Sequence, residues 1–321
     1  MEEPELPVID VARVRAQLEE RERDDRMDDG EPTPVVVCER VSRADFREWL
    51  DNHEGKLRCW EYEPLSETHG RVVVWSLPNF TRENTKSEVS RLITTAVQRI
   101  SGDIDVDETL SYPDATRIDV GDRDQAADAS IMPEDAPYEN DQSVVIEVSY
   151  RNEKWEDVIA KLERWLSPST TVQVAIGVKI WPNKPRRTII VLRRNPAFVG
   201  DEDAGVDRLL RQELDFETAN DAPLPEVGFP LRLLYHGVAT PLQLQDHEDV
   251  AITIDLARLL KVINGAVRRD ARRREVAQLH EDAQLSDAAQ RREDDRLPDA
   301  ARCRSRSPLP PSRSVRPWTE A

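Results

Sequence analysis

The sequence predicts an α/β (α+β) domain in which a mixed β-sheet is flanked by helices, with charged segments at both ends of the chain. Short β-branched runs recur along the middle of the chain, and amphipathic helical patterns separate them. Charged residues make up 34% of the 321 residues. We expect a charged, mobile N-terminal arm at 1–34, one folded domain at 35–265, and an arginine-rich tail, helical or disordered, at 266–321.

The first part of the domain is predicted to contain a helix, a β-hairpin and a longer helix. A short helix begins after Ser42, because this residue can cap the first turn while Asp45 completes a capping-box pattern. The runs LRCWEYEPL and RVVVWSLP are separated by turn-forming residues and predict the hairpin. Apolar residues at three- and four-residue steps then predict a helix from Asn84 to Ile100.

The middle of the chain supplies most of the predicted sheet. ADASIM and QSVVIEVSY have the length and composition of strands, and the amphipathic segment Glu153 to Leu166 follows as a helix. Two further strands, TTVQVAIGVKIWP and RRTIIVLRR, are rich in β-branched residues. Strands and helices at these intervals favour a sheet domain over a sandwich or a helical bundle.

The last part of the predicted domain is less regular. Residues 201–228 are acidic and are predicted to form a surface excursion, and PLRLLYHGV is predicted as another strand. DVAITIDLARLLKVI predicts a strand or helix start that leads into a helix packed on the core.

The composition restricts the class of protein. No apolar run approaches the roughly 20 residues that cross a bilayer, and the N-terminus lacks the basic and apolar pattern of a secretory signal. We therefore expect an intracellular protein, cytoplasmic or nuclear, with no membrane association. Cys38, Cys59 and Cys303 are scattered, which predicts neither a disulfide framework nor a zinc site.

The formal net charge of −18 argues against a protein that coats nucleic acid nonspecifically, since phosphate affinity comes largely from Lys and Arg. The charge is unevenly distributed, because residues 266–321 contain 13 arginines and only 10 acids. A nucleic-acid ligand would have to meet local basic strips. These are Lys184 to Arg187 with Arg193 and Arg194, or Arg268 to Arg274, and the common alternative for such a strip is a solvated face or tail.

Glu147 is the residue that points most directly to chemistry. It lies among valines and an isoleucine in a predicted buried strand, where an unpaired carboxylate costs several kcal/mol. Such an acid is paired, lies near the strand end, or binds a cation. Asp128, in the preceding predicted strand, supplies a second carboxylate. Two carboxylates from adjacent strand ends can hold Mg²⁺ or Mn²⁺.

The helix after this strand supplies a third group. Its apolar stripe includes Trp155 and Trp165, which we expect to pack in the core, and Lys154 and Lys161 lie together along the flank of that stripe. A lysine at this edge can carry its ammonium to the strand end and stabilise charge on a phosphate. Lys154 and Lys161 compete for this role.

These motifs together resemble a known family. The order is an Asp on a short strand, apolar-Glu-Val-Ser, a helix with Lys-Leu-Glu-Arg-Trp, and a strand reached through Ser-Pro-Ser-Thr, preceded by the EYEP…GRVVVW hairpin. It resembles the Uma-type restriction endonuclease family of the PD-(D/E)XK nuclease superfamily over roughly residues 42–182. The resemblance implies a restriction-endonuclease-like core, phosphodiester cleavage that depends on Mg²⁺ or Mn²⁺, and nucleic acid, DNA in particular, as partner.

The resemblance also implies roles for individual residues. Asp128 matches the first metal-binding acid, Glu147 the second, and Lys161 a lysine that in this family has moved from the strand to the helix. Either Glu61 or Glu63 matches the acid of the hairpin. The remaining correspondences are looser, since Ala127 stands where the family has Pro, Ser149 is one residue early, and Asp119 or Asp124 replaces Asp128 if the strand shifts.

Two hypotheses follow. The first is a metal-dependent nuclease in which Glu147→Ala abolishes cleavage, leaves the fold intact and raises thermal stability by removing repulsion between two acids. The alternative is a catalytically inactive nuclease-fold protein that binds nucleic acid or another protein through its arginine-rich tail. A homodimer is the candidate assembly.

Overall fold

The structure of the chain is a computed structural model. It describes residues 11–23, 34–53, 60–74, 79–113, 117–120, 123–138, 141–150, 153–181, 184–198, 207–217 and 224–296. The chain divides into two compact units, Met1–Arg268 and Arg269–Ala321. Cys59, Cys303, residues 1–10 and 24–33 of the predicted N-terminal arm, and residues 297–321 of the predicted tail lie outside the described residues.

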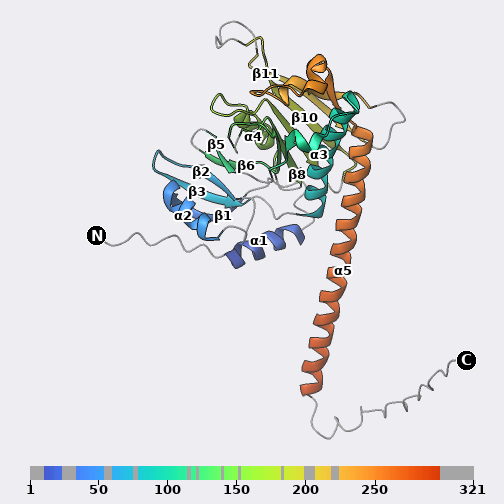
Figure 1. Cartoon of the computed structure of the whole chain (residues 1–321). Coiled ribbons are helices and arrows are strands. Elements are labelled where there is room, and N and C mark those ends of the chain that lie inside the picture. Colours follow the sequence, from blue (N-terminus) through green and yellow to red (C-terminus); the bar gives the residue numbers. More distant parts are fainter. Residues whose placement is uncertain are drawn as a thin grey trace, which may run out of the picture. The chain divides into compact units, whose positions relative to one another are not determined.

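A six-stranded mixed sheet lies at the centre of the first unit (Figure 1). Its strand order is β11–β10–β9–β8–β7–β4. The bounds are β4 Leu110–Ser111, β7 Ala129–Pro133, β8 Val144–Tyr150, β9 Val174–Ile180, β10 Arg187–Arg194 and β11 Leu209–Phe216. β8 and β9 run parallel, and the other neighbouring pairs run antiparallel. A parallel pair needs a crossover, which here contains helix α4 (Trp155–Trp165).

Helices cover both faces of this sheet. Side chains alternate between the faces along a strand, so Ile146 and Val148 point to one face of β8 and Val145 to the other. Helix α3 (Phe80–Ile100) packs with the first set, and α4 packs with Val145. The predicted fold class, a mixed sheet flanked by helices, is confirmed. Glu147 shares its face with Val145 and therefore faces α4.

A second, three-stranded sheet has the order β1–β3–β2. Its strands are β1 Val35–Ser42, β2 Trp60–Pro64 and β3 His69–Val74, and it packs with α1 (Val11–Arg23) and α2 (Arg43–His53). The predicted hairpin is confirmed as β2–β3. The predicted cap is confirmed as well, since the backbone N–H of Asp45 donates to Ser42 Oγ, which in turn donates to the Asp45 carboxylate.

Several shorter elements were not expected. The acidic region before β7 contains the hairpin β5 (Arg117–Val120) and β6 (Arg123–Ala126). The predicted surface excursion at 201–228 contains the edge strand β11, and the strand predicted in PLRLLYHGV is wrong, because Leu231–Leu233 form a 3₁₀ turn. β12 (Val227–Pro230) pairs with β13 (Ala251–Ile254), and β13 confirms the strand that was one of the two predictions for the start of DVAITIDLARLLKVI. Further 3₁₀ helices are Val106–Glu108 before β4 and Leu242–His247 before β13.

Helix α5 (Leu256–Arg296) begins in the first unit. There it buries apolar residues that include Leu259 and Ile263 in the same core as α3. Among the residues that the structure describes, no helix is both long and apolar enough to cross a membrane.

Gly177 on β9 allows α4 to approach the sheet closely. A Cβ atom at this position would lie 2.7 Å from Leu162 Cδ1 and 2.8 Å from Ile190 Cγ2, both tighter than ordinary contact. We expect Gly177→Ala to lower the free energy of unfolding by about 1–3 kcal/mol, the usual cost of overpacking. Urea unfolding measures this. The control is Gly102→Ala, where nothing lies within 4 Å; equal losses in both variants would contradict the argument.

Candidate functional site

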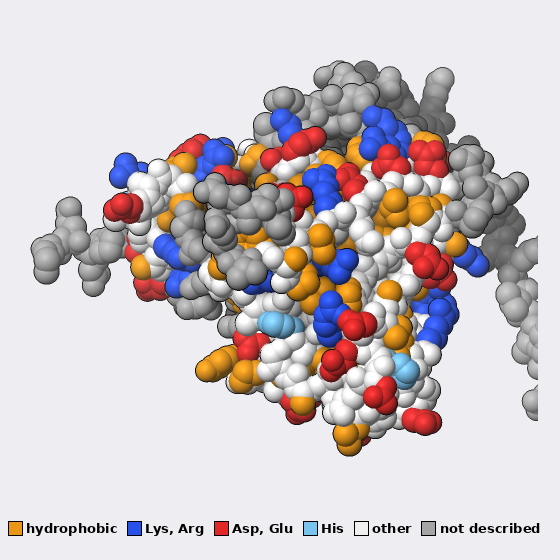
Figure 2. Space-filling view, turned by 90° about the horizontal axis from the view of Figure 1, so that it is seen from above, with side chains coloured by type: hydrophobic (Ala, Val, Ile, Leu, Met, Phe, Trp, Pro, Cys, Tyr) orange, Lys and Arg blue, Asp and Glu red, His pale blue; other side chains and the backbone are white. Residues whose placement is uncertain are grey.

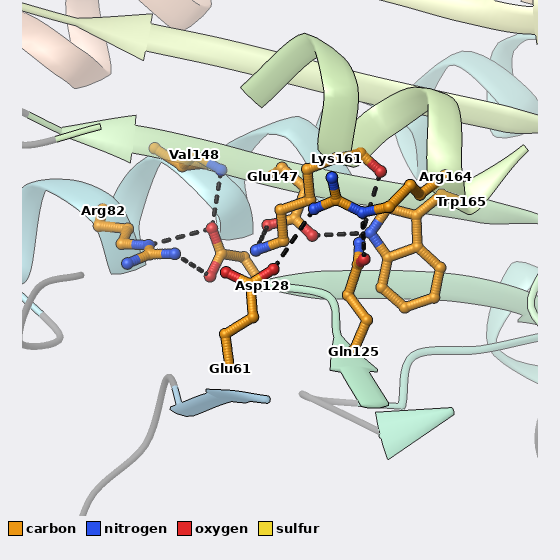
Figure 3. A network of polar contacts seen from close by, with 9 residues as sticks. All are labelled: Glu61, Arg82, Gln125, Asp128, Glu147, Val148, Lys161, Arg164 and Trp165. Carbon is orange, nitrogen blue, oxygen red and sulfur yellow. Dashed lines mark hydrogen bonds and ion pairs between the residues drawn. The ribbon is translucent and has the colours of Figure 1, made fainter. Parts of the chain in front are cut away.

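The carboxylate of Glu147 is buried and paired. The residue lies in the middle of β8 and is 3% exposed. Trp165 Nε1 donates a hydrogen bond of 2.8 Å to Glu147 Oε1, and Lys161 Nζ lies 2.9 Å from Glu147 Oε2 (Figure 3). Both oxygens therefore have donors from α4, which explains how an acid is tolerated between apolar neighbours.

The position of α4 brings both donors to the same acid. Lys161 and Trp165 are four residues apart, so they lie one turn apart on the same side of the helix. Val158 and Leu162 anchor the helix in the core on this face of the sheet. Trp165 was expected to serve only as packing, but its buried ring also places an N–H donor on the carboxylate.

Asp128 lies one residue before β7, at a bend, and not within the strand as predicted. The β7–β8 ladder ends at the Ala129–Ile146 pair. Beyond it, the Asp128 carboxylate accepts a hydrogen bond of 2.7 Å from the backbone N–H of Val148 on β8. Arg82 at the start of α3 holds the same carboxylate with two bonds, from Nε at 3.0 Å and from Nη2 at 2.6 Å. The resulting pair is bidentate and largely buried.

Asp128 and Glu147 belong to one electrostatic network (Figure 3). Burial raises the pKa of Glu147 to about 7, Lys161 opposes this rise, and the charge of Asp128 adds to it. Burial by itself would lower the pKa of Lys161, but the surrounding carboxylates, Glu147 first, raise it above its ordinary value. Lys161 is therefore a charged ammonium at neutral pH.

The hairpin β2–β3 contributes a further acid to this network. Glu61 is 9% exposed and pairs with Arg164 Nη2 at 3.3 Å. Arg164 Nε also donates to Gln125 Oε1, and the Gln125 amide donates to the backbone carbonyl of Lys161. Glu63 instead pairs with Arg71 at 2.6 Å. Of the two candidate hairpin acids, Glu61 is the one bonded to α4.

A cavity of about 190 Å³ opens beside Lys161. It is lined by Glu61, Glu63, Arg123, Glu153, Asp157, Ala160, Lys161 and Arg164. Burial raises the pKa of Glu153, and the positive charges of Lys161 and Arg82 oppose that rise. The cavity is smaller than the roughly 300–1,000 Å³ of sites for drug-sized ligands, so it is too small to enclose a whole nucleotide.

The other residues that the sequence suggested for this site make different contacts. Lys154 is the N-cap residue of α4, and the lysine that reaches Glu147 is Lys161. Ser149 Oγ accepts a 3.0 Å bond from the buried Lys179 on the adjacent strand. The backbones of Asp119 and Asp124 are paired in the β5–β6 ladder.

Arginines of the first predicted basic strip, Lys184 to Arg187 with Arg193 and Arg194, bind backbone carbonyls and acids of the protein itself. Arg187 is 3% exposed and donates to the backbone carbonyls of Trp181, Lys184 and Arg186, while Arg194 donates to carbonyls in the loop before β9. Arg186 is half exposed and pairs with Asp215 at 3.1 Å. Figure 2 shows Lys and Arg side chains interspersed with acids on the face that it presents.

The donor set at Asp128 and Glu147 suits a hard cation. Among the described residues, no group of three or more His, Cys, Asp and Glu side chains is arranged to hold a metal ion. Mg²⁺, however, is commonly bound by one or two carboxylates, with water and phosphate completing its shell. The two carboxylates are therefore donors of the kind that bind Mg²⁺ or Mn²⁺, and Lys161, which is paired with Glu147, lines the polar cavity.

Two of the site's contacts had no signal in the sequence. Arg82 lies 46 residues before Asp128. Nothing in the sequence distinguishes this arginine, at the start of a charged helix, from a solvated residue. To predict the hydrogen bond from the Trp165 indole to Glu147, one would need to know the direction in which the ring nitrogen points, and the sequence does not give it. The four-residue spacing of Lys161 and Trp165 was the available signal for their shared side of the helix.

No protein-family model matches the chain, and no curated protein matches it. Among solved structures, the chain is similar to a protein from Anabaena variabilis ATCC 29413 described as "a putative nuclease belonging to DUF820". The two share 14% sequence identity, the match covers 70% of this chain and 99% of that chain, and the TM-score is 0.38. The functional reading of the site therefore rests on the geometry of this chain.

Proposed function

We propose that the protein is a metal-dependent nuclease that hydrolyses phosphodiester bonds in DNA, with Asp128, Glu147 and Lys161 as its catalytic residues. The observation that supports this most directly is the convergence of two carboxylates and one lysine, from three separate elements, in a single polar network. Lys161 also lines the cavity that would receive the phosphate.

In this proposal Asp128 and Glu147 would hold Mg²⁺ or Mn²⁺. When bound, such an ion polarises a phosphoryl oxygen and lowers the pKa of a bound water. Lys161 keeps its positive charge at neutral pH, so its ammonium is suited to stabilise negative charge that develops on the phosphate. Trp165 holds Glu147 in place by a buried hydrogen bond, which fixes the carboxylate before substrate arrives.

The test is cleavage of single- and double-stranded DNA and RNA by the full-length protein, with Mg²⁺, Mn²⁺ or chelator. We expect cuts in DNA that require the metal and that Asp128→Asn reduces by about 10²-fold or more, since a ligand to the ion is lost. A well-folded protein that leaves every substrate intact with both metals would rule the proposal out.

A second candidate function is a nuclease-fold module that binds nucleic acid without cleaving it. Two observations favour it: Arg82 already neutralises Asp128, and the stretch of α5 from Arg268 to Arg273 carries four exposed arginines, Arg268, Arg269, Arg272 and Arg273. Replacing all four by Gln in the full-length chain would then weaken DNA binding and its salt dependence, whereas Asp128→Asn would leave binding unchanged. Intracellular location and a homodimer stay predictions from the sequence.

A further inference from the structure

The guanidinium of Arg82 occupies the side of the Asp128 carboxylate to which a metal cation would bind. The guanidinium meets both oxygens of the carboxylate, at 3.0 and 2.6 Å, and the two side chains are only 8% and 11% exposed. The Val148 N–H takes a further position on Oδ2. Among the described residues, three donor contacts therefore converge on a carboxylate with about four acceptor positions.

We propose that Arg82 is a built-in counter-cation that competes with the divalent metal for Asp128, so that metal binds only when the guanidinium leaves this carboxylate. The inference rests on the proposed function, because it concerns the same metal site. It adds a residue that sets metal affinity and that takes no part in holding the ion.

Two physical effects make Arg82 a competitor. Its two bonds occupy one acceptor position on each Asp128 oxygen, and with the Val148 bond they leave Oδ2 without a free position. Its fixed positive charge also repels a divalent ion on the same carboxylate, and burial strengthens that repulsion because little water screens it.

Lys161 is also positively charged, but it occupies fewer acceptor positions on its carboxylate than Arg82 does. It meets Glu147 through a single ammonium contact at Oε2, and the other oxygen faces the neutral indole N–H of Trp165. Each Glu147 oxygen therefore keeps an acceptor position with respect to these contacts. The difference assigns control of metal affinity to Arg82 and leaves Lys161 available for the phosphate.

The test is Mn²⁺ binding to the full-length protein without nucleic acid, measured by electron paramagnetic resonance of free Mn²⁺ and by the metal-induced shift in melting temperature. The variants are Arg82→Gln, Arg82→Lys and the double variant Arg82→Gln/Asp128→Asn. We expect Arg82→Gln to bind Mn²⁺ at least about tenfold more tightly than wild type and to melt lower without metal. Added Mn²⁺ should restore most of the lost melting temperature. The double variant should show neither the tighter Mn²⁺ binding nor this recovery.

Arg82→Lys decides the question if Arg82→Gln does not fold. An ammonium is a point charge that cannot hold both carboxylate oxygens as a guanidinium fork does, so this variant should also bind Mn²⁺ more tightly than wild type. Equal or weaker binding in the folded variants overturns the inference and makes the pair purely structural. Tighter binding without any DNA cleavage would leave the inference standing and refute the nuclease.

Discussion

Glu147→Gln is expected to lower metal-dependent DNA cleavage by about 10³-fold or more while the protein stays folded. The loss corresponds to the several kcal/mol of transition-state stabilisation that a metal ion contributes, since the neutral amide is a poor ligand for a hard cation. The amide oxygen still accepts the Trp165 hydrogen bond, so the strand and helix keep their contact.

Stability should not fall in this variant at pH 8. Folding raises the pKa of Glu147 from an ordinary value near 4.5 to about 7, first of all through burial. A carboxyl group of this kind stabilises the fold fully below its unfolded pKa, and that contribution disappears as the pH rises to about 7. Above pH 7 the wild type carries a cost of up to about 3 kcal/mol that glutamine avoids.

The measurement is cleavage rate beside urea unfolding at pH 8. The matched control is Glu156→Gln, an exposed acid in the first turn of α4, which should change neither quantity. If Glu147→Gln lost cleavage only because it unfolded, or cleaved as fast as wild type, the catalytic role of Glu147 would be refuted.

The sequence anticipated the parts of this molecule that follow from local pattern. The apolar run around Glu147, the stripe of α4 and the helix cap at Ser42 each depend on residues within a few positions of one another, and the structure has all three. A buried acid in such a strand was predicted to be paired, to lie near the strand end or to bind a cation, and a lysine on the helix flank was predicted to carry its ammonium to the strand end.

The misplaced elements have specific physical reasons. β11 is an edge strand with the sequence LLRQELDF, and its central residues are exposed, so it lacks the buried alternation that marks a strand. Leu231 and Leu233 flank Arg232, an alternation that resembles a strand, yet the three residues form a 3₁₀ turn after Pro230. The chain soon turns again at Gly237 with φ of 86°.

The site departs from its predicted form mainly at Asp128. The sequence placed this acid inside a strand, where its neighbours would be set by the ladder. Because it lies one residue outside the strand, its side chain bonds the Val148 N–H and reaches Arg82 on α3. This contact joins residues far apart in the chain, and local pattern carries no information about such a meeting.

Lys161→Met should lower the free energy of unfolding as the pH rises from 7 to 9, a range in which the free energy of unfolding of the wild type no longer falls through Glu147. Lys161 attracts the charge on Glu147 and so holds down a pKa that burial raises. Without the lysine, Glu147 ionises only above pH 7. Since stability is lost as the pH rises through the folded pKa, the two curves should have similar slopes below pH 7 and diverge between pH 7 and 9.

The divergence should amount to roughly 1–3 kcal/mol in the free energy of unfolding, at about 1.4 kcal/mol per pH unit while one group titrates. Urea unfolding with chelator present measures it, and the double variant Lys161→Met/Glu147→Gln is the control. Glutamine cannot ionise, so the extra loss above pH 7 should vanish there, whereas any contribution from Glu153 remains in both variants. Parallel curves for the single and double variants would mean that Lys161 does not govern the charge of Glu147, which removes the electrostatic basis for a shared catalytic role.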